Sequence, residues 1–182
     1  MKTREIKILG NIAYVPLSQG YVAIIDAADA EFVGQWSWFA HAPYKGLVYA
    51  NRNQKIEGGR LTIRLHRVLL RPDADMHVDH INGVGLDNRR SNLRVTTASE
   101  NQWNCGVRSD NTSGFKGVSF IRGQWQARIQ KNGKRIVIGC YASPKLAFEA
   151  YCKAAKTMHG EFANCGVDSP QTALRHLRVL AA

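Results

Sequence analysis

A short window near the middle of the chain holds the side chains best suited to chemistry. Asp79 and His80 stand next to each other, Asn92 follows, and Asn101 completes the series. Carboxylate and amide oxygens are ligands for a hard cation such as magnesium or manganese. A histidine has an unperturbed pKa suited to general-base work near neutral pH. Together these groups favour metal-assisted hydrolysis of a phosphodiester bond.

Three short elements and a loop are expected to position this window. Residues 76–80 are predicted as a brief strand, residues 82–91 as a loop, and residues 93–96 as a second strand. The sequence of residues 97–100, Thr-Ala-Ser-Glu, matches a capping box and predicts a helix start. Asn101 then falls in or near the first turn of that helix.

The catalytic pair needs a bend in the chain. Neighbouring residues on a regular strand point to opposite faces, so Asp79 and His80 serve one site only if the backbone turns there. The Asn82-Gly83 turn allows this. Asn92 is expected to hydrogen-bond the loop backbone and hold the imidazole in place.

The stretch VDHINGVGLDNRRSNLR, with Asn101 behind it, resembles the HNH class of ββα-metal (His-Me finger) nucleases, particularly homing-type endonucleases of phages and group I introns. The similarity covers roughly residues 66–101. It implies one divalent metal, Mg²⁺ or Mn²⁺, on Asp79 and Asn101, activation of water by His80, and support of the site by Asn92. No catalytic role is assigned to His66, which lies in a Leu-His-Arg element upstream and is expected to be structural.

The composition favours a polyanionic partner. The 182 residues carry 25 Lys and Arg against 14 Asp and Glu, which gives a net charge of +11 and a pI near 9.8. Nucleic acid fits such a surplus. A membrane partner is not expected, because no apolar run approaches the length that spans a bilayer. No signal core follows the N-terminus, so a cytoplasmic location, in a bacterial host of a phage or mobile element, is expected.

The four cysteines do not suggest a metal or disulfide framework. Cys105, Cys140, Cys152 and Cys165 form no C-x-x-C pair, so no structural zinc is expected. Reduced thiols that act as small apolar groups are the favoured interpretation.

A second module is predicted by periodicity. Residues 124–130 alternate between polar and apolar, as a half-buried strand does, and Asn132-Gly133 is a strong hairpin signal. A strand over residues 115–120 precedes them and another over 134–140 follows. Ser143-Pro144 opens a helix with an apolar stripe. The outward face of the sheet is expected to carry Gln124, Gln126, Arg128, Gln130, Arg135 and Val137, with Ile136 and Ile138 pointing inward.

The segments SGFKGVSF, RGQWQARI and GKRIVIGCY resemble the APETALA-two/ethylene-response-factor DNA-binding domain, from about Ser113 to Asn164. In that family a three-stranded sheet enters the major groove. The resemblance implies DNA contacts at Lys116, Ser119, Arg128, Gln130, Arg135, Val137 and Cys140. Residues 112–165 carry nine basic and two acidic residues, which is +7 of the total charge. A polar face kept only for solubility is the alternative.

The predicted fold is α+β in four parts. Residues 1–105 form an N-terminal β region plus the nuclease motif at about 66–104, 106–112 a linker, 113–165 the DNA-binding domain, and 166–182 a helical tail. The N-terminal region is predicted as short strands, with a strand or short helix over 60–70. Its aromatic residues are expected to form a core, although a base-stacking surface is the alternative: these are Trp36, Trp38, Phe39, Tyr44 and Tyr49.

The predicted function is therefore a metal-dependent, site-directed endonuclease on double-stranded DNA. One such centre per chain suggests a monomer that nicks, with a dimer as the alternative. Two competing hypotheses remain open: a DNA-binding regulator whose nuclease centre is inactive, and an RNA-directed nuclease.

Overall fold

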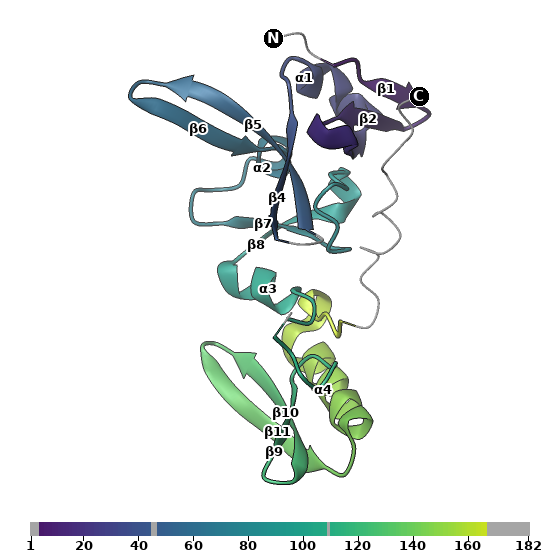
Figure 1. Cartoon of the computed structure of the whole chain (residues 1–182), viewed down its shortest axis with the longest axis vertical. Helices are drawn as coiled ribbons and strands as arrows, with labels where there is room; N and C mark the ends of the chain where they lie inside the picture. The colour runs from purple at the N-terminus through teal and green to yellow at the C-terminus, as the bar shows by residue number, and fades with distance from the viewer. Residues whose placement is uncertain (1–3, 45–46, 109, 167–182) are drawn as a thin grey trace. The chain divides into compact units, whose positions relative to one another are not determined.

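The computed structural model describes residues 4–44, 47–108 and 110–166 (Figure 1). Within that part, the chain up to Val95 forms one compact unit and the chain from Thr96 onward forms a second. Several small antiparallel sheets with few helices make the protein a mixed α+β fold, as predicted. The predicted boundaries at 105/106 and 112/113 stay predictions, and the helical tail predicted over 166–182 lies, apart from Gly166, outside the described residues.

The first unit begins with a three-stranded antiparallel sheet. Strands β1 (Lys7–Leu9), β2 (Ile12–Pro16) and β3 (Val22–Asp26) pair in sequence order. They agree with the predicted strand-rich start of the chain. The short helix α1 (Ala30–Gly34), which follows a single 3-10 turn, was not predicted.

A second antiparallel sheet contains strands β4 (Phe39–Tyr44), β5 (Leu47–Ile56) and β6 (Gly59–Arg64). Helix α2 (Leu65–Leu70) follows β6 directly. Residues 60–70, which were predicted as a strand or a short helix, contain both, because β6 ends at Arg64 and α2 begins at Leu65.

The motif strands form a two-stranded sheet of their own. Strand β7 (His77–His80) pairs with β8 (Leu93–Thr96), and helix α3 (Ala98–Trp103) follows. The capping box is confirmed: the Thr97 side chain accepts from the Glu100 backbone N–H, and the Glu100 carboxylate accepts from the Thr97 N–H. Helix α3 belongs to the second unit, so the metal-binding ββα arrangement stays a prediction.

One hydrophobic core joins the N-terminal sheets to the motif strands. Ala13 and Ile25 of the first sheet share it with Val78 of β7 and Leu93 of β8. Trp38 is 4% exposed in this core, and its indole N–H donates to the Val33 carbonyl at 3.0 Å. The core interpretation of the aromatic patch is therefore confirmed at Trp38.

The second unit carries another three-stranded antiparallel sheet on one helix. Strands β9 (Val118–Ile121), β10 (Gln124–Lys131) and β11 (Lys134–Tyr141) lie in the order β11-β10-β9, and α4 (Pro144–His159) packs on them. The hairpin prediction is confirmed, because Asn132 and Gly133 both have positive φ, 51° and 73°. The first strand is shorter than predicted and starts at Val118.

Alternation along β10 builds the core of this unit. Ala127 and Ile129 are buried against Ala147 and Tyr151 of α4. Helix α4 begins as predicted, with the Ser143 hydroxyl accepting from the Leu146 N–H at 3.2 Å. None of the helices in the described part of the chain has the length and apolar character needed to cross a membrane.

Candidate active site

His80 lies at the end of β7 and is almost wholly buried, at 5% exposure. Its Nε2 lies 3.3 Å from Oδ1 of Asn88, a residue with no exposed surface. The Asn88 amide is itself oriented, since its Nδ2 donates to the Gly85 carbonyl at 3.5 Å. An amide oxygen only accepts, so the imidazole proton lies on Nε2 and the lone pair on Nδ1.

Burial lowers the pKa of His80 below its usual value. The hydrogen bond to Asn88 and the nearby carboxylates of Asp79 and Asp87 act in the opposite direction. Because burial is the largest effect, the imidazole is neutral near neutral pH. A neutral imidazole is the form that a general base requires.

Two further rings pack against His80. The ring of His66, on α2, lies edge-on with its centroid 5.1 Å away, and the ring of Tyr49, on β5, lies at 5.9 Å. His66 is 3% exposed, and its buried Nδ1 has no hydrogen-bond partner among the residues that the structure describes. Burial, followed by the charge of His80, lowers the pKa of His66 to about 3. The structural role expected for His66 therefore includes packing against His80, the candidate general base.

Asp79 precedes His80 and is held by Arg94 of β8. Both Nε and Nη2 of Arg94 donate to Oδ2 of Asp79, at 2.9 and 2.8 Å. The side chains are 7% and 13% exposed, so this ion pair is largely shielded from water. Any cation that bound Asp79 would meet a carboxylate already engaged by a guanidinium group.

Asn92 ties the two ends of the motif loop together. Its Oδ1 accepts from the Asn82 backbone N–H at 3.0 Å, and its Nδ2 donates to the Asp87 carbonyl at 2.8 Å. The Ile81 N–H donates in turn to the Asn92 carbonyl at 2.9 Å. The expected hydrogen bonds from Asn92 to the loop backbone are therefore present, while its part in catalysis stays a prediction.

The motif loop is anchored to the N-terminal sheet by residues that sequence reasoning left without a role. The Arg90 guanidinium pairs with Asp29 at 2.7 Å, and the Arg90 backbone N–H donates to the Asp26 carboxylate at 2.8 Å. The Asn88 N–H donates to the Ile24 carbonyl at 2.7 Å. The segment from Ile24 to Asp29 thus anchors the loop.

Gly85 lets this loop approach β5 closely. A Cβ atom there would lie 2.4 Å from the Val48 carbonyl oxygen and 2.7 Å from the Tyr49 ring. Such distances leave no room for a side chain. The loop that orients Asn88 and the strand that carries Tyr49 therefore touch through backbone.

The two metal ligands predicted from sequence fall in different units, so a shared metal site stays a prediction. Asn101 lies in α3, which is in the second unit, whereas Asp79 lies in the first. Within the described ranges, no group of three or more His, Cys, Asp and Glu residues is arranged to hold a metal ion.

The predicted DNA-binding residues of β9, β10 and β11 do share one face. The antiparallel register sets Gln126 beside Ser119 and Cys140, Arg128 beside Val137, and Gln130 beside Arg135. A bulge at Ala127/Arg128 shifts the register within this face. Gln126 donates to the Cys140 sulfur at 3.5 Å and accepts from the Arg128 Nε. The inward prediction is met by Ile138, whereas Ile136 remains 37% exposed.

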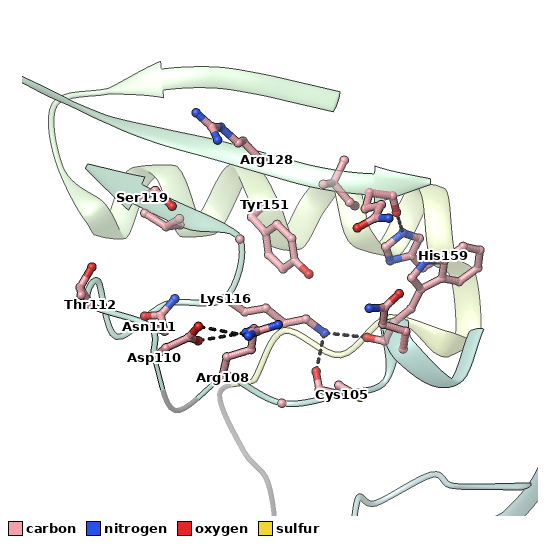
Figure 2. Close-up of a pocket in the computed structure, with 17 residues that line it drawn as sticks. Cys105, Arg108, Asp110, Asn111, Thr112, Lys116, Ser119, Arg128, Tyr151 and His159 are labelled. Carbon is pink, nitrogen blue, oxygen red and sulfur yellow. Dashed lines mark hydrogen bonds and ion pairs between the residues drawn. The ribbon is translucent and has the colours of Figure 1, made fainter. Parts of the chain in front are cut away.

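Lys116, for which the resemblance implies a DNA contact, has its ammonium group engaged within the protein. Its ammonium group donates to the carbonyls of Trp103, Cys105 and Asn164, at 2.6, 2.6 and 2.9 Å (Figure 2). These bonds use all three N–H donors of the ammonium. Burial lowers the pKa of Lys116. The side chain thus holds the strand entry to the end of α3, with no N–H left for a phosphate.

Comparisons with known proteins place the motif among nucleases. The family model described as HNH endonuclease matches residues 71–103. The chain is 33% identical over 164 residues to a protein of Acanthamoeba polyphaga mimivirus named as an uncharacterized HNH endonuclease, covering 88% of this chain and 84% of that one. It is 32% identical over 89 residues to Protein 3.8 of Escherichia phage T7, covering 48% of this chain and 73% of that one. No solved structure gave a significant match.

Proposed function

This chain belongs to the HNH endonuclease family, and we propose that it is a metal-dependent, site-directed endonuclease that cuts double-stranded DNA. The observation that carries the proposal is the buried His80 imidazole, held by Asn88 beside the Asp79 carboxylate, inside the segment that the family model matches. The net charge of +11 supports a nucleic-acid substrate.

His80 is the general base in this proposal. Its Nδ1 takes a proton from the attacking water, while Nε2 keeps its proton on the Asn88 Oδ1. The developing imidazolium is stabilised by the Asp79 and Asp87 carboxylates, which favour the charged form. Asn92 positions the base indirectly, because its bonds hold the loop from Ile81 to Asp87.

Asp79 and Asn101 are the residues that would hold the divalent metal. One carboxylate and one amide fit Mg²⁺ or Mn²⁺, which usually completes its shell with water and substrate phosphate oxygens. When bound, the metal supplies neutralisation of the charge that develops on the phosphate and the leaving oxygen.

Site selection is proposed to come from the sheet of the second unit. Ser119, Gln126, Arg128, Gln130 and Arg135 lie on one face of it, and Gln and Arg are suited to reading adenine and guanine edges. The resemblance of residues 113–164 to the APETALA-two domain supports this role. Val137, which is 53% exposed, offers an apolar contact on the same face.

One assay tests the proposal. Purified protein is incubated with supercoiled plasmid in magnesium, in manganese and in chelator, and the same samples are run for a gel shift. We expect open-circular product with metal and none with chelator, as one centre per chain makes one cut. An intact plasmid under every metal, with the shift retained, would favour the regulator and contradict the proposal. Preferential cleavage of an RNA of the same sequence would instead favour the RNA-directed nuclease.

A further inference from the structure

The β5–β6 hairpin is exposed on both of its faces. Residues 53–62 are all exposed, although they are paired across the two strands from Asn53↔Thr62 to Ile56↔Gly59. Figure 1 shows the hairpin extending beyond the rest of the first unit. Two-stranded hairpins are marginally stable alone in water. Nothing in the described part of the chain covers this one.

One face of the hairpin carries cations and amides. The register puts Lys55 directly opposite Arg60, with Asn53 opposite Thr62 next to them. The Thr62 hydroxyl donates to the Asn53 Oδ1 at 3.2 Å, and both residues are exposed. Like charges directly opposite each other destabilise a strand pair. An anion between Lys55 and Arg60 would reverse that effect.

At the base of the hairpin, a cation contacts two aromatic rings. The Arg52 guanidinium lies 4.5 Å from the centroid of the Trp36 ring and 5.8 Å from that of Trp38. Its Nε is buried and has no hydrogen-bond partner among the described residues. Trp36, Arg52, Lys55 and Arg60 line one open cleft of about 980 Å³, none of whose lining residues is acidic.

Within the hairpin sequence, basic residues outnumber acidic ones. Glu57 is the only acidic residue between Asn51 and Arg64, and it lies in the turn at the tip. The four cations in the same stretch are Arg52, Lys55, Arg60 and Arg64. The hairpin therefore presents a positive surface on a narrow support.

We propose that the β5–β6 hairpin is a second DNA-binding element, which enters the major groove with Lys55 and Arg60 against the duplex. The major groove admits a two-stranded β-ribbon and is about 8.5 Å deep. The four exposed residues on each strand extend about 13 Å, which exceeds that depth. This element is distinct from the sheet of the second unit. The inference rests on the proposed function, because it takes duplex DNA as the substrate.

The test compares matched charge removals on the full chain. Lys55→Gln with Arg60→Gln removes two charges from the hairpin, and Lys145→Gln with Lys153→Gln removes two exposed charges from α4. Binding to a fluorescein-labelled 30-base-pair duplex is measured by anisotropy, in chelator to prevent cleavage, over a range of salt. We expect the hairpin variant to bind about 10-fold more weakly and its salt slope to fall by about 1.8, from two lost phosphate-type contacts. The α4 variant should stay within about 2-fold of wild type with its slope unchanged.

Further arms separate the possible failures. If wild type does not bind the duplex, the proposed function fails. If wild type binds and the hairpin variant matches it in affinity and slope, the hairpin inference alone is overturned. Lys55→Arg with Arg60→Lys keeps both charges and should restore binding, so a loss from misfolding is distinguished from a loss of charge.

Groove placement and the type of nucleic acid have their own readouts. Bulky glucosylated cytosines fill the major groove, and they should weaken wild type more than the hairpin variant. An equal effect on both proteins contradicts insertion into that groove. The deep, narrow major groove of an RNA duplex excludes such a ribbon, so an equal or greater hairpin-dependent loss on RNA contradicts the assignment to DNA.

Discussion

The Arg94 guanidinium forms an ion pair with the Asp79 carboxylate, with Nη2 2.8 Å from Oδ2. The pair lies across β7 and β8, fifteen residues apart in sequence, and both side chains are largely buried. Without a metal ion, Arg94 therefore neutralises the charge of Asp79, the proposed metal ligand. A metal that binds Asp79 must share this carboxylate with Arg94 or displace it.

Arg94→Met is expected to expose this competition. A buried ion pair that loses one partner leaves an uncompensated charge, so the free energy of unfolding in chelator should fall by about 3 kcal/mol. Magnesium should then raise the melting temperature of the variant more than that of wild type, since no guanidinium competes. Adding Asp79→Asn should recover stability in chelator and remove the metal response. Equal metal shifts in wild type and Arg94→Met would contradict the competition.

Asn88 is expected to tune the base. The Asn88 hydrogen bond raises the pKa of His80, so Asn88→Ala should move the acid limb of the pH–rate profile to lower pH. Asn88→Asp brings a negative charge to the same position and should move it to higher pH. The rate constant at saturation should fall about 10- to 100-fold in Asn88→Ala, because the imidazole loses its orientation. If the acid limbs of Asn88→Ala and Asn88→Asp do not shift in opposite directions, Asn88 does not set the pKa of His80.

His66 is expected to make the protein acid-sensitive. Its pKa of about 3 in the folded chain is below the unfolded value of about 6.5, so the unfolded chain binds the extra proton as the pH falls. Stability is complete above pH 6.5 and declines below about pH 6, by about 1.4 kcal/mol per pH unit. Urea unfolding of wild type and His66→Phe between pH 7 and 4.5 measures this. His80 titrates in both proteins, so identical slopes would show that His66 contributes nothing.

Gly85→Ala is expected to disturb the contact between the motif loop and β5. The added Cβ would meet the Val48 carbonyl at 2.4 Å, and a backbone atom cannot swing away. We expect a loss of about 1–3 kcal/mol in unfolding free energy, with lower activity because the Gly85 carbonyl orients Asn88. Gly59→Ala is the control, since nothing lies within 4 Å of its Cβ position. A small, equal effect of both substitutions would mean that the loop can shift freely.

Local signals predicted much of the fold. The capping box at Thr97, the Asn132-Gly133 hairpin and the Ser143 cap each depend on a few neighbouring residues, and each is present. The strand over residues 124–130 was likewise predictable from its alternation, because burial follows a period of two in a half-covered strand.

The contacts that shape the candidate site could not be read in this way. The Arg94–Asp79 pair depends on how β7 meets β8, and the contact of His66 with His80 depends on where α2 docks. Asn88 stands inside the motif beside Asp87, but only the loop path turns its amide toward His80. Residue type and spacing indicated the reacting groups, whereas tertiary packing determines what surrounds them.

Lys116 illustrates the same limit. A lysine at the start of a basic sheet is a reasonable phosphate contact, and the resemblance assigned it that role. The end of α3 and the segment at Asn164 instead provide three carbonyl acceptors around its ammonium group. Carbonyls that come together from distant parts of a chain leave no pattern in the sequence.

The most direct measurement of the central claim is single-turnover cleavage by His80→Ala beside wild type. Both proteins, in excess over a supercoiled plasmid with magnesium, are sampled over time, and their affinity for the same DNA is measured in chelator. We expect His80→Ala to bind DNA within about 2-fold of wild type, while its cleavage rate constant falls at least about 100-fold. Cleavage by His80→Ala at the rate of wild type would contradict the assignment of His80 as the base.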